Sequence, residues 1–511
     1  MPVYFKSQNI STDLRLLLDS LAVKGQALAM IDFRPVGYII GLLVAALGLT
    51  MLVPFAVDFL SGAESAGTFA LCATITVVAG GLLTLSTANA RLDSLSLQQT
   101  FLLTTSSWLV LPIFGALPFW LGEPNASYTD AFFEAMSGLT TTGSTVFSNL
   151  DTLPKGTLLW RGLMQWFGGV GIIVVAMAFL PTLKVGGMQI FRSEGFDTIG
   201  KVLPRAGQIA SSIAVVYLLL TVACVFSYAA VGMQFFDAVV HSLTTVATGG
   251  FSNYDSSFAG FGGGVEYVAT VFMMLASLPF IRYVQMLNGS AQPLFRDSQV
   301  WAFFGFWTLL VIGMALFRHF DAGAGAEGAF RQSVFNVTSI LTGTGYASTD
   351  YGLWGAFPVM LFFLMGLVGG CAGSTCCSIK IFRFQLLAAA IRSQIQKIHS
   401  PNGIFTPRYQ GRRVGEDILS SVMAFFVAFM LTLATLTIIL GLLGLDPVTA
   451  ISGAATALAN VGPGLGEVIG PSGNFAPLPD SAKWVLSAAM LIGRLELMAV
   501  YVLFTAAFWR H

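Results

Sequence analysis

Four stretches of this chain share one pattern, and that pattern decides the fold. They read Ser137-Gly-Leu-Thr-Thr-Thr-Gly143, Thr244-Thr-Val-Ala-Thr-Gly-Gly250, Ser339-Ile-Leu-Thr-Gly-Thr-Gly345 and Thr456-Ala-Leu-Ala-Asn-Val-Gly462. Counting back from the last glycine, every copy has a hydroxyl residue at the sixth position, and at the fourth an aliphatic one: Leu139, Val246, Leu341 and Leu458. The repetition indicates that the four glycines serve the same purpose in four copies of one unit.

Composition places this repeat in a membrane. Hydrophobic residues make up 55% of the 511 residues, charged residues 10%, and the mean hydropathy is +0.78. Such a chain exposes too little polar surface for a large soluble globule. The zero net charge gives no reason to expect nucleic-acid binding. The five cysteines lie in apolar stretches without the paired spacing of a zinc site, so we interpret them as packing residues: Cys72, Cys224, Cys371, Cys376 and Cys377.

Ten stretches reach the roughly 20 apolar residues that a bilayer-spanning helix needs. They are 36–60, 67–89, 98–121, 158–181, 209–231, 266–288, 299–318, 355–379, 417–444 and 483–508. Basic residues gather in 182–208 and 380–416, so the positive-inside rule places this face and both termini in the cytoplasm. The opposite loops are acidic, and we expect an outer vestibule that concentrates cations there. Its candidates are Asp130, Asp151, Asp237, Asp255, Asp350, Asp446, Glu467 and Asp480.

The order of the spans predicts an all-α integral membrane protein built from repeats. After two helices, the order helix, short semi-polar segment, helix occurs four times, and the shared motif always lies in the short segment. These segments, about 130–142, 237–249, 332–344 and 448–461, suit a half-crossing helix and an extended return, which is a re-entrant pore loop. Four loops can surround one pseudo-four-fold pore.

The same order predicts the domain boundaries. They are a cytosolic N-terminal lead without a signal-peptide cleavage site (1–35), two extra transmembrane helices (36–92), pore repeat 1 (93–182), pore repeat 2 (183–289), pore repeat 3 with a gating loop and a basic cytosolic loop (290–416) and pore repeat 4 (417–511).

Glycine at the end of each motif suits an ion filter. A cation that loses its water needs carbonyl oxygens in exchange, and glycine allows the backbone to turn those carbonyls inward. The predicted filter residues are Thr141, Thr142, Gly143 and Ser144; Thr248, Gly249, Gly250 and Phe251; Gly343, Thr344, Gly345 and Tyr346; and Asn460, Val461, Gly462 and Pro463. Phe251 and Tyr346 occupy the aromatic position of the Thr-Val-Gly-Tyr-Gly filter of potassium channels, whereas Ser144 and Pro463 depart from it. The alternative is that the glycines only allow close helix packing.

With Gly168-Gly-Val-Gly-Ile-Ile173, Gly369-Gly-Cys-Ala-Gly-Ser-Thr375 and Gly493-Arg-Leu-Glu496, the four loops resemble the TrkH branch of the Trk/Ktr/HKT potassium-transporter superfamily over residues 36–511. The resemblance implies potassium uptake across the bacterial inner membrane by a homodimer, each protomer with its own pore. It also implies a TrkA-type cytosolic regulatory subunit that binds the nucleotide itself. Potassium is then the transported ion, and this chain carries no covalently bound cofactor.

The resemblance also implies a gate. The family has an intramembrane loop below the filter, and the stretch that matches it here is Gly369, Gly370, Cys371, Ala372, Gly373, Ser374 and Thr375. The helix-weakening residues of this stretch predict a break in the eighth span. Close packing is the alternative. Cys376 and Cys377 follow where the family usually has glycines. The family's arginine in the Gly-Arg-Leu-Glu setting matches Arg494, implying a cation below the filter; the alternative is a buried ion pair.

Two other functions remain to be weighed. A proton- or sodium-coupled potassium symporter needs a carboxylate at mid-membrane depth, and Glu496 is the one deep acidic candidate. An enzyme is not expected, because the four histidines are scattered and the sequence shows no Ser/His/Asp grouping. Glu134 and His241, each nine residues before a filter glycine, are expected to orient the loops.

Overall fold

The computed structural model of the chain describes residues 31–63, 65–91, 95–178, 186–188, 190, 206–320, 323 and 325–509. Within these residues, seven helical stretches are long and apolar enough to cross a membrane. They are Arg34–Ser61, Ala66–Ser86, Leu97–Leu121, Lys155–Val175, Ala210–Ala230, Ser298–Phe320 and Glu416–Leu442. Most of the predicted lead (1–35) and of the basic segment 182–208 lies outside the described residues.

The remaining three predicted spans are interrupted. The span predicted at 266–288 is bent by 87° between Gly263–Ala276 and Phe280–Leu287, and the span at 483–508 by 104° between Asp480–Arg494 and Met498–Phe504. The span at 355–379 is helical only over Ala356–Gly366 and then breaks, as its glycines predict. Continuous helices at 266–288 and 483–508 were therefore wrong predictions, because Pro279 and the left-handed backbone at Glu496 and Leu497 end the helices there.

Helices account for nearly all of the regular structure. Before the repeats come α2 (Arg34–Thr50), α3 (Leu52–Ser61) and α4 (Ala66–Ser86). Repeat 1 contains α5 (Leu97–Gly115), α6 (Leu117–Leu121), α7 (Tyr128–Leu139) and α8 (Lys155–Ala178), and repeat 2 contains α11 (Ala206–Ala230), α12 (Phe235–Val246), α13 (Gly263–Ala276) and α14 (Phe280–Leu287). Repeat 3 contains α15 (Gln292–Phe295), α16 (Ser298–Phe320), α17 (Ala326–Leu341) and α18 (Ala356–Gly366). Repeat 4 contains α20 (Glu416–Leu442), α21 (Pro447–Ala459), α22 (Gly466–Ile469), α23 (Asp480–Arg494), α24 (Met498–Tyr501) and α25 (Ala506–Trp509).

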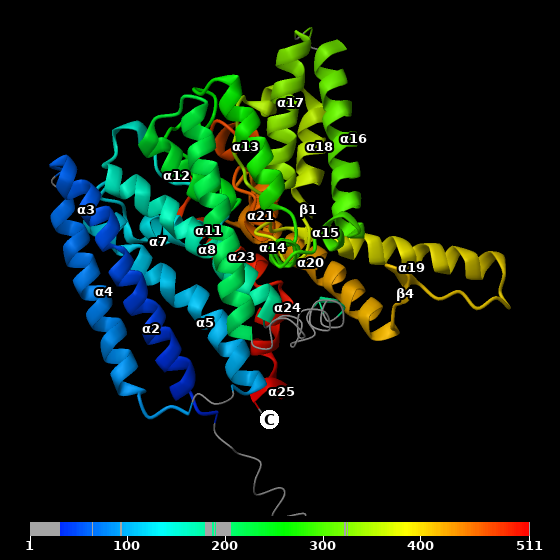
Figure 1. The fold of residues 1–511 in the computed structure, drawn as a ribbon, viewed down its shortest axis with the longest axis horizontal. Coiled ribbons are helices and arrows are strands. Elements are labelled where there is room, and N and C mark those ends of the chain that lie inside the picture. Colours follow the sequence, from blue (N-terminus) through cyan, green and yellow to red (C-terminus); the bar gives the residue numbers. More distant parts are fainter. Residues whose placement is uncertain are drawn as a thin grey trace, which may run out of the picture.

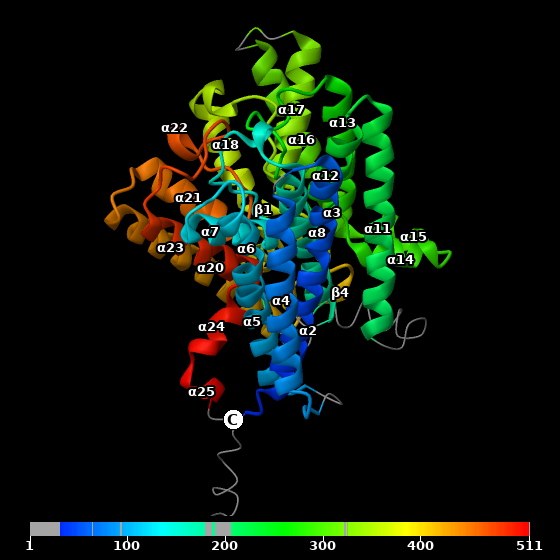
Figure 2. The same ribbon diagram turned by 90° about the vertical axis from the view of Figure 1, so that its left-hand side faces the viewer.

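The repeats close into a ring. The pore helices are α7, α12, α17 and α21, and each packs between the outer and inner helix of its own repeat. The inner helix of each repeat also packs on the pore helix of the next: α8 on α12, α13 on α17, α18 on α21 and α23 on α7. The last contact returns to repeat 1. Figures 1 and 2 show α2, α3 and α4 as a separate layer on the side of repeat 1.

Helix starts follow local capping chemistry. Ser96 and Gln99 form a capping box before α5, and Ser127 accepts the Asp130 N–H at the start of α7. Asp446 caps α21, where a proline takes the first turn. These polar caps stand where the chain turns back toward the membrane, so they fix the entry of the outer and pore helices.

Two small sheets belong to the connection between repeats 3 and 4. Strand β1 (Val368–Gly369) pairs in parallel with β2 (Ile379–Lys380), and β3 (Arg408–Tyr409) pairs antiparallel with β4 (Arg412–Arg413). Helix α19 (Ile381–His399) follows β2 and extends away from the bundle (Figure 1). The ends of the described chain lie together beside α5, because Gln98 bonds to the Phe508 carbonyl (2.6 Å) and Gln99 to that of Asp32 (2.8 Å).

Candidate ion filter and gate

All four pore helices end in the same way. The residue that opens each filter segment has a positive φ: 51° at Thr141, 49° at Thr248, 74° at Gly343 and 54° at Asn460. The next amide then donates to the carbonyl five residues back, at 2.9 Å for Thr142, 2.8 Å for Gly249, 2.8 Å for Thr344 and 3.1 Å for Val461. These are Schellman caps, and the hydroxyl residue of each sequence motif supplies the accepting carbonyl.

This conformation is costly for two of the segments. Glycine and asparagine adopt a positive φ readily, but Thr141 and Thr248 are β-branched, and such residues are rare there. A backbone held in this region costs on the order of 1–3 kcal/mol at each position. The sequence carries no signal for these two residues, since only Gly343 and Asn460 are typical of a helix C-cap.

Each filter glycine faces a carbonyl of the next segment. The φ values are 85° at Gly143, 82° at Gly250, 85° at Gly345 and 107° at Gly462. A Cβ atom built on three of these glycines would overlap a carbonyl oxygen of the next segment: Gly143 faces Gly249, Gly250 faces Thr344 and Gly345 faces Val461. A Cβ atom built on Gly462 would lie 3.0 Å from the carbonyl oxygen of Thr142. These approaches run once around the four repeats and return to the first. The four predicted segments therefore lie side by side in one ring.

The fourth residue anchors the ring in three of the four segments. The Tyr346 hydroxyl lies 3.2 Å from the Thr245 hydroxyl of α12, and the Phe251 ring lies 4.2 Å beneath the Arg161 guanidinium. Where the aromatic residue is missing, Ser144 donates to the Gly462 carbonyl at 2.7 Å. A hydrogen bond to the neighbouring segment thus takes the place of the aromatic contact at Ser144.

A cavity of about 210 Å³ opens above the ring and touches all four filter glycines. Of the acidic residues expected in an outer vestibule, Asp255 is the one that lines it within the described chain, and its carboxylate accepts the amides of Asn149 (2.7 Å) and Leu150 (3.2 Å). Asp130 instead pairs with Lys483 at 2.6 Å. Much of the acidity therefore serves structure.

Side chains of the pore helices hold the return strands. Glu134 accepts the Val146 amide at 3.0 Å and pairs with Arg161 at 2.8 Å, and Asn336 accepts the Ser348 amide at 3.1 Å. Both acceptors stand nine residues before a filter glycine, and both donors stand three residues after it. In repeat 2, His241 lies 3.0 Å from the Ser252 hydroxyl, two residues after the filter glycine. In repeat 4, Ser452, ten residues before the filter glycine, accepts the Leu465 amide at 3.0 Å. These contacts agree with an orienting role.

Sequence reasoning missed Gln165. Its side-chain amide on α8 donates to the Gly249 carbonyl, and its oxygen accepts the Phe251 amide at 3.1 Å. Gln165 is fully buried, so it fixes the second filter segment from behind. The available signal was a polar residue within the apolar span Lys155–Val175.

The predicted gating loop lies under the ring. Gly369 belongs to β1, and the chain from Gly370 to Thr375 lies in the break at 277–279 of the bent helix pair α13 and α14. The Cys371 amide donates to the Ser277 carbonyl (3.1 Å), and the Phe280 amide to the Gly373 carbonyl (3.0 Å).

The loop also contacts the filter and α16. The Thr375 hydroxyl accepts from Thr248 at 3.2 Å, and the Ala372 amide donates to Gln299 at 2.9 Å. Ser374 bonds back to the Cys371 carbonyl at 2.7 Å. The loop is thus joined both to the base of the filter and to the outer helix of its own repeat.

Arg494 reaches the same place from α23. Its guanidinium donates to the Cys377 sulfur and, at 2.8 Å, to the Gly168 carbonyl, and the residue is 2% exposed. Cys377 in turn lies 3.7 Å from the Thr141 hydroxyl. Within the described residues Arg494 has no carboxylate partner, because Glu496 pairs with Arg383.

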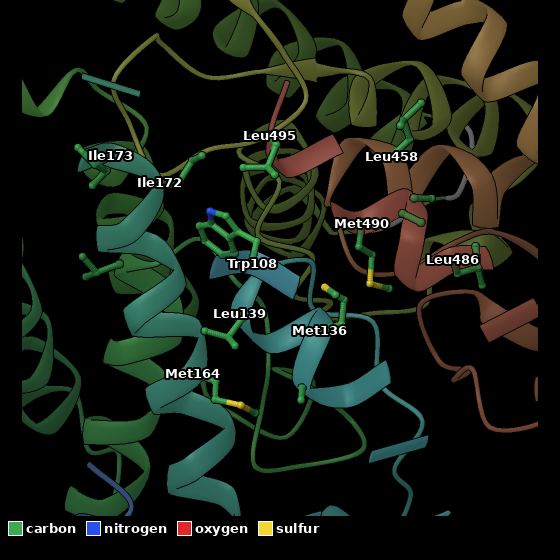
Figure 3. Packing of buried hydrophobic residues seen from close by; sticks show 14 of the residues in the cluster. Trp108, Met136, Leu139, Met164, Ile172, Ile173, Leu458, Leu486, Met490 and Leu495 are labelled. Carbon is green, nitrogen blue, oxygen red and sulfur yellow. The ribbon is translucent and has the colours of Figure 1, made fainter. Parts of the chain in front are cut away.

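Apolar packing holds the filter base in place. Leu139 of α7 and Leu458 of α21, two of the aliphatic residues of the repeated motif, lie in one buried cluster with Trp108, Met164 and Leu495 (Figure 3). Gly168 and Gly493 allow α8 and α23 to approach the carbonyls of Leu139 and Leu458, respectively. The aliphatic position of the motif is therefore a packing position behind the ring.

Four re-entrant half-helices ending in one ring, inside a bundle of apolar spans, define a pore-loop transport protein of membranes. A family model described as "TrkH: Cation transport protein" matches residues 67–289 and 294–511. The chain belongs to the TrkH family, which confirms the resemblance inferred from the loops. The family is one of cation transport proteins.

Curated relatives match almost the whole chain. It is 44% identical over 481 residues to the Trk system potassium uptake protein TrkI of Halomonas elongata, covering 94% of this chain and 97% of that one. It is 36% identical over 488 residues to TrkH of Vibrio parahaemolyticus, covering 94% and 100%. The crystal structure of the potassium transporter TrkH from Vibrio parahaemolyticus has a TM-score of 0.87 at 34% identity, over 94% of this chain and 100% of that one. The predicted fold class is confirmed.

Proposed function

We propose that this chain takes up potassium across the bacterial inner membrane through a channel-like filter. The observation that carries the proposal is the ring in which each filter glycine abuts a carbonyl of the next repeat. Stacked carbonyl oxygens can replace the hydration shell of a potassium ion. The relatives that match along nearly the whole chain are named as potassium uptake proteins.

The proposed gate is the loop 369–375 with Arg494. The loop contacts the filter base through Thr375, and the Arg494 guanidinium is buried below the ring. A fixed positive charge there opposes the passage of a cation. The gate opens when a partner binds the open and closed forms with different affinity. We expect that partner to be a TrkA-type cytosolic subunit, which carries the nucleotide, acting on a homodimer whose termini face the cytoplasm.

The second candidate is a proton- or sodium-coupled potassium symporter. Glu496 is the deep carboxylate that such coupling would use, and it is 9% exposed. It is paired with Arg383, which is fully buried. The ion pair with this buried arginine engages the Glu496 carboxylate in a contact within the protein. This contact favours a structural role for Glu496 and the channel-like function for the chain.

Growth tests the proposed function. The chain, expressed with its cognate regulatory subunit in a bacterium that lacks potassium uptake systems, is expected to restore growth at low potassium. A variant with serine at Gly143, whose Cβ would overlap the Gly249 carbonyl, should fail to restore selective uptake while still reaching the membrane. Failure of the unchanged chain to restore growth, although membrane fractions contain it, would overturn the proposal.

A further inference from the structure

A small cavity of about 30 Å³ lies below the filter and is unusually rich in positive charge. Its charged lining residues within the described chain are Lys380, Arg383, Arg494 and Glu496. The rest of the wall comes from the gate region, including Gly373 and Ser374, and from apolar side chains of neighbouring helices. A water molecule needs about 10–15 Å³ of such volume, so the cavity has room for about two or three particles of that size.

The cations around the cavity are only partly satisfied. Arg494 uses both terminal nitrogens on Cys377 and Gly168, but its Nε has no partner among the residues that the structure describes. Arg383 donates from Nε to the Gly186 carbonyl (2.9 Å) and from Nη2 to Glu496, but its Nη1 has no partner in the same described part of the chain. Both side chains are buried, and each guanidinium lies against an aromatic ring. Buried donors of this kind are normally paired, so two vacant N–H groups point to a missing acceptor.

The charges do not balance either. Lys380 donates to the Cys376 carbonyl, which is neutral. Among the described lining residues, Glu496 supplies one negative charge against three positive ones. Unbalanced charge in a buried site is expensive unless it is paired. We propose that this cavity binds one small monovalent anion of the chloride class, which accepts from Arg494 and Arg383 and lowers the net charge of the described cluster from +2 to +1.

Three other sources could satisfy the cluster. Water fills vacant hydrogen bonds but brings no charge. A Cys377 thiolate would neutralise Arg494, yet it leaves the Arg383 Nη1 vacant. The C-terminal ends of the four pore helices carry about half a negative charge each, but their effect fades within one turn. Carbonyls at these ends also already accept the amides of the Schellman caps. Of these sources, a bound anion is the one that brings both negative charge and an acceptor to the described residues of the cluster.

The first test measures binding rather than transport, so its outcome is separate from whether the chain moves potassium. Thermal unfolding of the purified full-length protein is followed at constant ionic strength while potassium gluconate is replaced by potassium chloride. A ligand that binds only the folded state raises the melting temperature and saturates, and we expect a rise of about 2 °C or more. An unchanged melting temperature would overturn the proposal, and would leave water or the thiolate as the partner.

Variants locate the effect. Arg494→Gln should lower or abolish the chloride-dependent rise, whatever it does to the melting temperature in gluconate. Lys483→Gln is the matched control, because Lys483 is an equally buried cation that pairs with Asp130 elsewhere, and this variant should keep the full rise. A rise that survives in Arg494→Gln would place chloride at another site and contradict the inference.

The second test needs no variant. Crystals of the unchanged protein grown in bromide, with diffraction measured at the bromine absorption edge, should show an anomalous peak within hydrogen-bond distance of the Arg494 Nε. Density without an anomalous signal would identify a water molecule and refute the proposal.

Discussion

Replacing Gly345 by serine tests the carbonyl ring at one of its close approaches. The φ of 85° costs a residue with a side chain roughly 1–2 kcal/mol, and the new Cβ would overlap the Val461 carbonyl and lie 2.9 Å from the Pro463 ring. Real Cβ atoms do not approach other atoms so closely, so the Val461 carbonyl must turn away. A ring that loses one oxygen loses part of its preference for potassium. If that oxygen contributes about 1.4–2.8 kcal/mol, selectivity over sodium falls by about 10- to 100-fold.

The assay compares rubidium or potassium uptake with sodium uptake in vesicles whose membrane potential is clamped. Gly444→Ser is the matched control, because Gly444 has a similar φ of 91° but open space around its Cβ position. Gly462→Ser should be intermediate, since its Cβ would lie 3.0 Å from the Thr142 carbonyl. Unchanged selectivity in Gly345→Ser, or an equal loss in Gly444→Ser, would refute the reasoning from the ring.

Three further predictions concern the gate and the support of the filter. Arg494→Ala should raise potassium flux about tenfold, because it removes about 1.4 kcal/mol of barrier. It should also cost less stability than Arg161→Ala, which leaves the buried Glu134 without its partner and costs about 3–5 kcal/mol. Flux and melting temperature measured together check this, and unchanged flux with a large loss of stability would favour the interpretation of Arg494 as half of a structural pair. Deleting three residues that include glycines from 369–375 removes the contacts below the filter and should leave the pore open and insensitive to the regulatory subunit; full closure when that subunit is withdrawn would place the gate elsewhere. Gln165→Leu leaves the Phe251 amide without its acceptor, so it should lower stability by about 1–3 kcal/mol and reduce selectivity. Wild-type selectivity in vesicles would show that the second filter segment keeps its conformation without Gln165.

The repeated motif predicts the ring well because its positions have separate physical roles. The glycine needs a positive φ, the aliphatic residue is buried behind the filter, and the residue at the sixth position provides the capping carbonyl. These requirements are local, so they can be read from the sequence of each repeat.

Contacts between repeats could not be predicted in this way. Gln165 acts on a filter segment of another repeat, and the pairing of Glu496 with Arg383 depends on a bend that the apolar composition of the last span conceals. The bend itself comes from positive φ values at Glu496 and Leu497, residues that normally avoid that region. The sites where sequence patterns fail are thus those where segments far apart in the chain meet.

The pairing of charged residues could not be predicted from the sequence either. Acidic residues in outer loops predict a vestibule, but composition does not show which carboxylates are already engaged. Asp130 pairs with Lys483, and Asp237 bonds to Asn253 and Tyr254, each at 2.7 Å. Burial and this contact with Asp237 raise the pKa of Tyr254 to about 12, so the phenol stays protonated and keeps donating at neutral pH.

The reversal potential of the current through the purified protein tests the central claim most directly. It is measured in a planar bilayer with the regulatory subunit present and with unequal potassium on the two sides. A channel-like filter predicts a reversal potential that follows the potassium gradient and does not move when a proton or sodium gradient is added. A reversal potential that shifts with the added gradient in the proportion set by fixed coupling would contradict the account and establish symport.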